Sequence, residues 1–295
     1  MNLVVSASGF LGGEVCEELI AQGLPVRGMV RKTSDPARVS WLKGLGIEVV
    51  NGDLRDRASL DKNCQGVDAV IATSTSVFTY VPGENDIQRL DLQGLINLVD
   101  AARAAGVKHF IYTSFSGNID YDFPLRNAKR AVEKHLIASG MVYTILRPSF
   151  FMEAWLTPPL GFDFPNAKAT IYGSGQNSMS WISRRNVAQF AVESLRNPAA
   201  HNAILELGGP ETLTPLQVVK IFEQVGGQPF ELAYVPAEIF VEQQKAATDD
   251  LQKTFPGLML AYVQGDPIDM TAIQKTFPIK LTTVQEYAQR VLTPV

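Results

Sequence analysis

The feature that most constrains the fold is a regular alternation of short apolar runs with amphipathic segments over the first half of the 295 residues. Apolar runs of four to eight residues indicate buried strands, and intervening segments with a helical period that end at Gly indicate helices. The predicted strands are 2–6, 25–30, 47–53, 68–75, 109–114 and 142–148, and the predicted helices are 11–23, 87–106 and 125–140. Strands that are apolar along their whole length, alternating with helices, are typical of a parallel sheet covered on both faces. The sequence therefore predicts an α/β fold with a doubly wound parallel sheet.

The alternation breaks after Pro148, so we expect a large domain over 1–150 and a smaller region over 151–295. Residues 150–165 are rich in aromatic residues and proline, which favours a loop or short helix. A helix over 186–198 and a strand over 203–209 suggest that 178–209 returns to the first domain. The remainder is predicted to form mostly short helices, making a discontinuous C-terminal cap.

Composition excludes several classes of protein. The formal net charge is −4, with 26 basic and 30 acidic residues interspersed, which argues against nucleic-acid binding through a basic surface. Cys16 and Cys64 form no CxxC pair, and the three histidines have no metal-ligand spacing, so neither a disulfide framework nor a metal site is expected. No signal peptide or membrane span is recognised, and two cysteines fit a reducing compartment, so a cytoplasmic protein is expected.

The stretch VVSASGFLGG, residues 4–13, has the order strand, glycine-rich turn, helix that a dinucleotide site requires. Gly9 would let the backbone approach a phosphate, and Gly12 would let the helix lie close to the sheet. Ser6 stands where such turns begin with Gly, and its hydroxyl, with that of Ser8, could donate to phosphate. The alternative is an ordinary turn in a fold that has lost its ligand.

The end of the second strand bears on the choice of cofactor. Arg31 and Lys32 follow that strand in place of the acid that binds the ribose of NAD, which suits the 2′-phosphate of NADP. A solvated basic turn is the alternative. Asp53, after the third strand, could approach the adenine amino group, or could simply form an Asp turn or helix cap.

Together these segments resemble the NmrA-like branch of the atypical short-chain dehydrogenase/reductase family. The matching segments are SASGFLGG, VRK, GDLRD, ATSTS, KHFIYTSFSG, KRAVEKHLIASGMVYTILRPSFFME and ISRRNVAQ, within about residues 1–200. The resemblance implies a Rossmann domain that binds NADP(H) and a C-terminal region that shapes a substrate pocket. The cofactor-binding residues that it implies, with Ser6 included, are Ser6, Ser8, Gly9, Phe10, Leu11, Arg31, Lys32, Asp53, Leu54, Thr73, Ser74, Thr75, Ser76, Ser114, Lys129, Pro148, Ser149 and Phe150.

The chain departs from the wider family at its proton donor. Short-chain dehydrogenases use Tyr-x-x-x-Lys, but Leu125 stands four residues before Lys129. The candidate catalytic residues are therefore Lys129, Ser114 and Tyr121, the last in a loop eight residues before the lysine. Asn186 is a second departure, because the family often has Asp there. Ser114 and Ser116 form no nucleophile elbow.

Aromatic side chains follow the last strand of the predicted Rossmann domain, at Phe150, Phe151, Trp155, Phe162 and Phe164, with Trp181 later. They suit a flat apolar substrate, or alternatively the packing core of the cap. Phe115, Phe151, Trp155 and Trp181 are the predicted substrate contacts.

The expected function is NADPH-dependent reduction of a quinone-like, dye-like or unsaturated carbonyl acceptor by a monomer or homodimer. The alternatives are a non-catalytic NADP(H) sensor that acts through a protein partner, and a degenerate dinucleotide fold with a structural role.

Overall fold

The computed structural model describes residues 1–293 and contains two sheets. Seven strands form the larger sheet in the order β3-β2-β1-β4-β5-β6-β9. The five pairings that join β1 to β6 are all parallel. The strand bounds are β1 Asn2–Val5, β2 Val26–Val30, β3 Glu48–Asn51, β4 Ala69–Ala72, β5 His109–Thr113, β6 Val142–Pro148 and β9 Ala203–Leu207. The predicted Rossmann-type α/β fold is confirmed.

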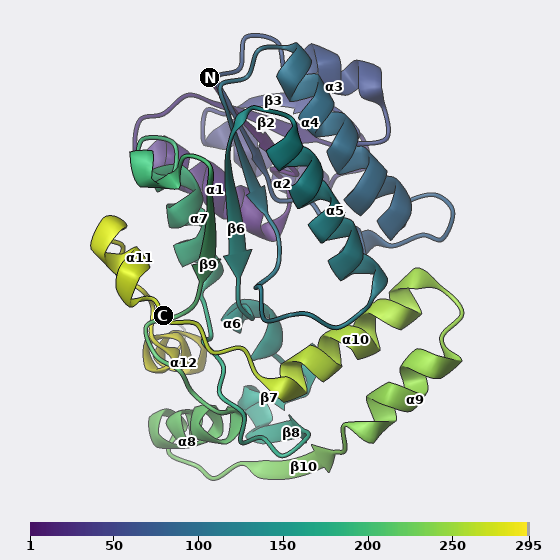
Figure 1. Cartoon of the computed structure of the whole chain (residues 1–295). Helices are drawn as coiled ribbons and strands as arrows, with labels where there is room; N and C mark the ends of the chain where they lie inside the picture. The colour runs from purple at the N-terminus through teal and green to yellow at the C-terminus, as the bar shows by residue number, and fades with distance from the viewer. Residues whose placement is uncertain (294–295) are drawn as a thin grey trace. The chain divides into compact units, whose positions relative to one another are not determined.

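Helices cover both faces of this sheet, with α3, α4 and α5 on one side and α1 and α7 on the other (Figure 1). Their bounds are α1 Phe10–Ala21, α2 Pro36–Gly44, α3 Arg57–Asn63, α4 Leu95–Ala104, α5 Pro124–Ala138 and α7 Arg184–Glu193. A buried apolar cluster joins β1, β4 and β5 to α4 and α5, with Leu3, Val70, Phe110, Leu98 and Val132 among its members. Burial on both faces explains why the central strands β1, β4 and β5 are largely apolar along their whole length.

The strand register aligns the carboxyl ends of the central strands. Val5 of β1 pairs with Met29 of β2 and with Ala72 of β4, and Ala72 pairs with Tyr112 of β5. The loops that begin at residues 6, 31, 73 and 114 therefore leave the sheet along one edge. Ligands of open α/β sheets bind at this edge.

The chain divides into two compact units. Unit 1 consists of Met1–Ser114, Asn127–Arg147 and Val187–Leu205, and unit 2 of Phe115–Arg126, Pro148–Asn186 and Glu206–Val295.

Unit 2 contains a three-stranded sheet in the order β10-β8-β7, in which β10 is parallel and β7 antiparallel to β8. Its strands are β7 Phe162–Asp163, β8 Lys168–Tyr172 and β10 Glu231–Val235. Its helices are α6 Met152–Trp155, α8 Pro215–Gly226, α9 Glu238–Ala246, α10 Asp250–Gln264, α11 Thr271–Thr276 and α12 Val284–Leu292. From the sequence we predicted a loop and short helices here, and this sheet was missed. Its strands are short and β10 is largely exposed, so the apolar pattern of a buried strand is absent.

The segment predicted as one helix over 87–106 is two elements. Ile87–Gly94, labelled η2, is π-helical, and α4 follows directly. π-Helical turns are rare and occur frequently at functional sites.

Candidate functional site

The glycine-rich turn joins β1 to α1, and its glycines are required by close backbone contacts. A β-carbon on Gly12 would collide with the carbonyl oxygen of Ser6, and one on Gly9 would lie 3.1 Å from the same atom. Gly9 is the N-cap of α1; no side chain caps this end, and the first turn contains no acidic residue. The helix therefore presents its positive end at the turn, which suits an anionic group.

Ser6 adopts the left-handed backbone conformation, with φ of 64°. The hydroxyl groups of Ser6 and Ser74 share a hydrogen bond of 2.7 Å, which ties the turn to the loop after β4. The conformation that Gly adopts without strain is thus held here by a serine with a specific partner.

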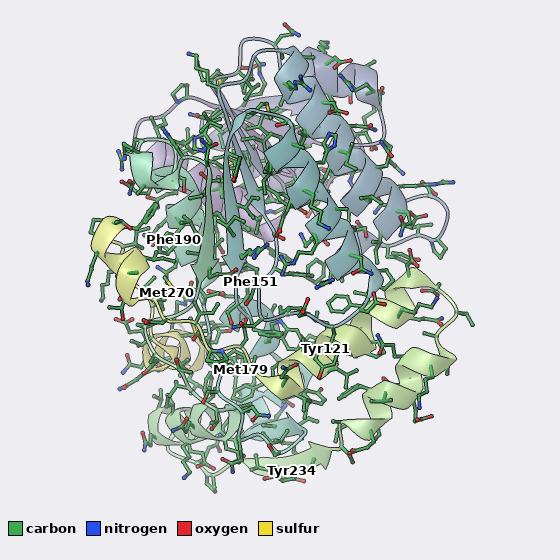
Figure 2. All side chains as sticks on the ribbon, viewed as in Figure 1. Tyr121, Phe151, Met179, Phe190, Tyr234 and Met270 are labelled. Atoms are coloured by element: carbon green, nitrogen blue, oxygen red, sulfur yellow. The ribbon has the colours of Figure 1, made fainter. Side chains whose placement is uncertain are left out.

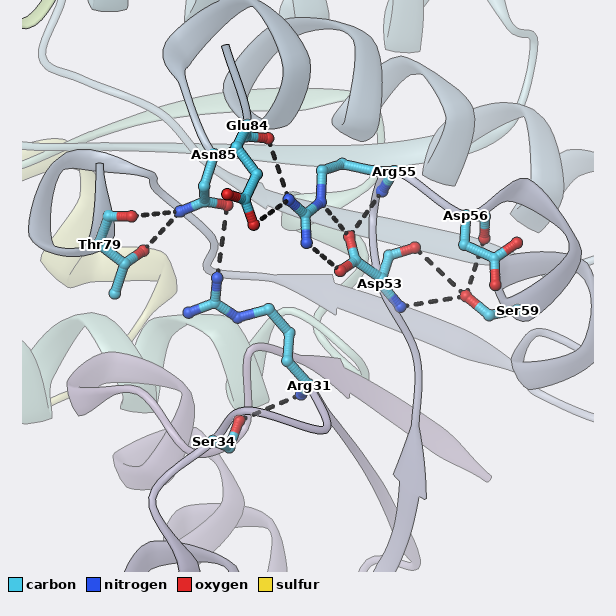
Figure 3. A network of polar contacts seen from close by, with 9 residues as sticks. All are labelled: Arg31, Ser34, Asp53, Arg55, Asp56, Ser59, Thr79, Glu84 and Asn85. Atoms are coloured by element: carbon cyan, nitrogen blue, oxygen red, sulfur yellow. Dashed lines mark hydrogen bonds and ion pairs between the residues drawn. The ribbon is translucent and has the colours of Figure 1, made fainter. Parts of the chain in front are cut away.

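A second set of polar contacts surrounds the end of β2 (Figure 3). The backbone N–H of Arg31 donates to Ser34 Oγ at 3.1 Å, and Ser8 Oγ donates to the same oxygen at 3.1 Å. The guanidinium of Arg31 donates to Asn85 Oδ1 at 3.4 Å. Arg31 is therefore positioned by the loop 77–86, whereas Lys32 is exposed.

Asp53 forms a bidentate ion pair with Arg55. Nε and a terminal nitrogen of Arg55 donate to the two carboxylate oxygens at 2.9 and 2.6 Å, and the Arg55 backbone N–H donates as well. Hydrogen bonds from Arg55 hold the pKa of Asp53 below its usual value. Arg55 also donates to the carbonyl oxygen of Glu84 at 3.0 Å, so it reaches the same loop as Arg31 (Figure 3). Three of the roughly four acceptor positions of Asp53 are thus occupied, which leaves little capacity for an adenine amino group.

Arg38 is a residue that the sequence analysis missed. It donates to the carbonyl oxygens of Ser8 and Gly9, both at 3.2 Å, and its guanidinium lies 4.3 Å from the centre of the Trp41 ring. A β-carbon on Gly13 would lie 2.5 Å from the Arg38 guanidinium, so Gly13 makes room for this contact. No motif spacing pointed to Arg38, because it acts on backbone atoms.

Buried polar atoms without hydrogen-bond partners among residues 1–293 gather at the carboxyl ends of β4 and β5. They include Thr75 Oγ1, Ser76 Oγ, Asp91 Oδ1 and Thr113 Oγ1. Thr73 is not among them, because its hydroxyl donates to Val5 O at 3.0 Å. Buried polar groups are normally paired, so this group of atoms is where a polar ligand or water would complete the structure.

Lys129 belongs to this region. It is buried on α5, and its Nζ donates to Thr113 O at 3.1 Å. Burial lowers the pKa of its ammonium, and the negative charges of Asp91 and Glu133 partly restore it. Ser114 is also buried, and Arg130 donates to its hydroxyl at 3.4 Å. The structure thus brings together, within unit 1, two of the three predicted catalytic residues.

Tyr121, the third, belongs to unit 2. It packs against a cluster formed by Phe240, Met259 and Leu260, and Figure 2 shows it beside α10. Pro148, Ser149 and Phe150 are in unit 2 as well. The Ser149 backbone N–H donates to Leu207 O at 2.8 Å, while its buried hydroxyl has no partner among residues 1–293.

The predicted aromatic cluster is in fact two clusters. Phe150, Trp155 and Trp181 surround Tyr262, with Trp155 stacked on the Tyr262 ring at 4.9 Å between centres. Phe162 and Phe164 instead pack on Phe222, and Phe162 also packs on Phe230. Sequence reasoning missed Tyr262, since it lies about a hundred residues after Trp155 in a helix that carries no motif.

Two of the predicted contacts with substrate or cofactor are core residues. Trp181 is 1% exposed and donates its ring N–H to Leu213 O at 3.2 Å, and Phe150 is 3% exposed. A cavity of about 430 Å³ opens elsewhere in unit 2, lined by Gly173, Ser174, Tyr234, Pro236, Ala237, Glu238 and Val263. Figure 2 shows Tyr234 on β10, and none of the four predicted substrate residues lines this cavity.

Several kinds of chemistry find no support in the described part of the chain. No group of three or more His, Cys, Asp or Glu side chains within residues 1–293 has the arrangement of a metal site. Both cysteines are buried and unpaired, and burial raises the pKa of Cys16 to about 12 and that of Cys64 to about 11, so neither thiol forms a thiolate readily. Over the same residues, no helix combines the length and apolarity needed to cross a membrane.

A parallel sheet with a glycine-rich turn after β1 and buried polar groups at its carboxyl edge defines a dinucleotide-binding type of α/β protein. The model of the NmrA-like family matches residues 2–288, and the chain belongs to this family. The resemblance seen in the sequence is therefore confirmed.

Comparison with individual proteins gives relatives of different kinds. The chain is 31% identical over 250 residues to the NAD(P)H azoreductase of Xenophilus azovorans, covering 84% of this chain and 80% of that protein. It is 30% identical over 242 residues to the photosystem II assembly factor Ycf39 of Trieres chinensis, covering 79% and 72%. The structure of an NADPH-dependent quinone oxidoreductase from Escherichia coli, QOR2, solved with NADPH, superimposes with a TM-score of 0.79 at 24% identity, over 99% of this chain and all of that one.

Proposed function

We propose that this protein is an NADPH-dependent reductase of small apolar or aromatic acceptors. The observation that carries the proposal is the buried Lys129 beside unpartnered buried hydroxyl groups at the carboxyl ends of β4 and β5. The glycine-rich turn begins at the same edge of the sheet. Burying an ammonium and several unpaired hydroxyl groups is costly unless a ligand uses them. Membership of the NmrA-like family and the likeness to an azoreductase agree with such a ligand and such a reaction.

Each part of unit 1 has a role in holding the cofactor. The N-terminus of α1 and Gly9 receive the pyrophosphate, Arg31 receives the 2′-phosphate, and Thr73 to Ser76 with Lys129 hold the nicotinamide riboside. The Arg38 guanidinium donates hydrogen bonds to the Ser8 and Gly9 carbonyl oxygens, so these two oxygens are directed away from the phosphates. NADPH, once bound, supplies the hydride.

The acceptor class follows from the missing tyrosine. Leu125, one helical turn before Lys129, is 2% exposed and cannot supply a proton. A quinone that takes up a hydride becomes a stabilised oxyanion, so it needs no strong acid, and the one proton that completes the hydroquinone comes from Lys129 or solvent. The reaction then balances as quinone, NADPH and one proton giving hydroquinone and NADP⁺. Azo dyes and unsaturated carbonyl compounds are alternative acceptors, and Phe115, Phe151 and Trp155 are proposed to contact them.

The experiment is a calorimetric titration of the protein with NADPH and, separately, NADH, followed by NADPH oxidation with a panel of quinones and azo dyes. Micromolar affinity for NADPH, much weaker binding of NADH and turnover of at least one acceptor support the proposal. Failure of both nucleotides to bind would show that the turn containing Ser6 no longer serves a ligand.

A second function, a non-catalytic NADP(H) sensor that acts through a protein partner, is favoured by one comparison. Ycf39 of Trieres chinensis is named as an assembly factor, and it is about as similar to this chain as the azoreductase is. Tight NADPH binding without oxidation by any acceptor in the panel would support the sensor.

A further inference from the structure

Asn85 is a buried polar side chain in the loop 77–86, and the proposed function so far gives it no role. It is 4% exposed, although most of this loop is exposed. Its side-chain amide donates to the carbonyl oxygen of Thr79 at 2.6 Å and to Thr79 Oγ1 at 2.8 Å. Its backbone N–H and carbonyl oxygen both bond to Val81, at 2.8 and 3.1 Å. The loop is therefore folded around Asn85.

These contacts fix the orientation of the Asn85 amide. A backbone carbonyl oxygen only accepts hydrogen bonds, so the group of Asn85 that contacts Thr79 O must be the NH2 group. The amide oxygen, Oδ1, is consequently the atom toward Arg31, whose guanidinium donates to it at 3.4 Å (Figure 3). This distance is long for a hydrogen bond, so the contact directs the guanidinium without holding it tightly.

Arg31 is thus held at both ends of its side chain. Its backbone N–H donates to Ser34 Oγ at 3.1 Å, and its carbonyl oxygen accepts the Ser34 N–H at 3.0 Å. Asn85 Oδ1 is the one acceptor of the Arg31 guanidinium among residues 1–293. The other N–H groups of the guanidinium can therefore donate to an anion. An arginine that is directed before the anion binds loses less side-chain freedom on binding than a free one does.

The loop is fixed in turn from the end of β3. Arg55 donates to the carbonyl oxygen of Glu84, the residue before Asn85, at 3.0 Å. Arg55 is itself held by its bidentate ion pair with Asp53. Two arginines that lie beyond the ends of the paired strands β2 and β3 therefore contact consecutive residues of one loop (Figure 3). This arrangement keeps Asn85 Oδ1 within reach of Arg31.

We propose that Asn85 is a specificity-determining residue, which directs Arg31 toward the 2′-phosphate and so sets the preference for NADPH over NADH. This inference rests on the proposed function, in which Arg31 receives that phosphate. A phosphate monoester accepts paired, charge-assisted hydrogen bonds from a guanidinium, so its affinity depends on how well the guanidinium is directed. NADH has a hydroxyl group in this place, so its affinity does not.

The test measures the affinities of Asn85→Ala for NADPH and NADH by calorimetry. We expect NADPH affinity to fall by about three- to tenfold, because Arg31 then loses more side-chain freedom on binding, and NADH affinity to change by less than about twofold. Equal weakening of both nucleotides, or no weakening of NADPH, would overturn the proposal.

The matched control is Thr79→Val. It removes one acceptor of the Asn85 amide, while the Thr79 carbonyl oxygen and the contact with Arg31 remain. Thr79→Val should change neither affinity. A loss of NADPH affinity as large as that of Asn85→Ala would show that the loop matters only through its stability, and it would refute a role for the Asn85 oxygen.

A double variant separates the direction of Arg31 from the stability of the loop. If Asn85 acts through Arg31, adding Asn85→Ala to Arg31→Ala should cause no further loss of NADPH affinity beyond about twofold. Losses that add in full would mean that the two residues act independently, and they would contradict the proposal.

Asn85→Asp serves as a second variant if Asn85→Ala does not fold. Its carboxylate would pair with Arg31 and compete with the phosphate for the guanidinium. NADPH affinity should fall by about tenfold or more, with NADH affinity unchanged, whereas unchanged or tighter NADPH binding would count against the proposal. A wild-type protein that binds NADPH selectively but reduces no acceptor would refute the proposed function and leave this inference standing. A wild-type protein that reduces acceptors but binds both nucleotides equally would refute the inference alone.

Discussion

At the scale of single residues, Ser6 shows how a site departs from its usual sequence. Its φ of 64° is the left-handed conformation, which destabilises an L-residue by about 1–2 kcal/mol. Its hydrogen bond to Ser74 stabilises the folded state by about 1 kcal/mol and so offsets much of that cost. Ser6→Gly removes both effects. We therefore expect a change in unfolding free energy within about 1 kcal/mol and a change in NADPH affinity below about tenfold.

The control for Ser6→Gly is Ser74→Ala, which loses the same hydrogen bond while Ser6 keeps its conformation. Ser74→Ala should be the less stable variant, by about 1 kcal/mol, in urea unfolding followed by circular dichroism. A Ser6→Gly protein that was less stable than Ser74→Ala would mean that the left-handed conformation of Ser6 costs nothing here.

Substitution of Gly12 gives a sharper prediction, because a side chain at this position would meet backbone atoms, which cannot rotate out of the way as a side chain can. A methyl group at this position would collide with the Ser6 carbonyl, so the turn and α1 must move apart. Gly12→Ala should lose about 3 kcal/mol of stability, at the upper end of overpacking effects, and should not bind NADPH measurably by calorimetry. Gly44→Ala on α2 is the matched control, since a β-carbon there has open space and should lower neither property.

Arg31 tests the choice of cofactor. If its guanidinium meets the 2′-phosphate, Arg31→Ala weakens NADPH binding by about tenfold or more and leaves NADH binding unchanged, because only NADPH has that phosphate. The control is Arg57→Ala, an exposed arginine paired with Asp61 at 2.8 Å on α3. Equal weakening of both nucleotides by Arg31→Ala would exclude the assigned role.

At the scale of elements, a buried histidine joins β5 to β6 and makes stability depend on pH. Thr144 Oγ1 donates to Ala200 O at 2.7 Å, so the 2.8 Å contact between His109 Nε2 and Thr144 Oγ1 requires the imidazole to donate. Burial, and to a lesser extent His201, lowers the pKa of His109 from 6.5 to about 4. Below pH 6.5 the unfolded chain binds a proton that the folded chain does not, so stability is full above that pH and is lost as the pH falls toward 4.

The size of this effect is bounded by about 1.4 kcal/mol per pKa unit, so His109 contributes at most about 3 kcal/mol of acid sensitivity. His109→Gln keeps an N–H donor but does not titrate. Urea unfolding at pH 7 and pH 4.5 should show the wild type losing more stability than the variant between the two. Equal losses would mean that His109 remains able to protonate in the folded protein.

Elements also show what the sequence could predict. The central strands β1, β4 and β5 were predictable since all of their residues are buried, which makes each a largely apolar run. The π-helical turn at Ile87–Gly94 was not, because its composition is that of an ordinary amphipathic helix. Some site residues could be found because they follow a strand or stand in a motif, as do Gly9, Arg31 and Lys129. Others could not, because only packing between segments distant in the sequence places them: Arg38, Asp91 and Tyr262.

At the scale of the whole molecule, the two units are interleaved along the chain. Each consists of three segments that alternate, so the chain passes between them five times. The segments 115–126 and 148–186 lie within the sequence of unit 1, yet they belong to unit 2, where Phe123 and Trp181 are each 1% exposed. A sequence boundary near residue 150 therefore does not separate two independent domains.

This connectivity predicts the behaviour of a truncated chain. A fragment of residues 1–205 retains every segment of unit 1, but it leaves 115–126 and 148–186 without residues 206–295, against which their apolar side chains pack. Gly257, for example, lies so close to the Phe123 ring that a β-carbon would collide with it, and Tyr262 stacks on Trp155. Exposed aromatic side chains of this size favour aggregation. The fragment should be insoluble or bind a hydrophobic dye strongly, whereas a soluble fragment with a cooperative thermal transition would show that unit 1 folds without its partner.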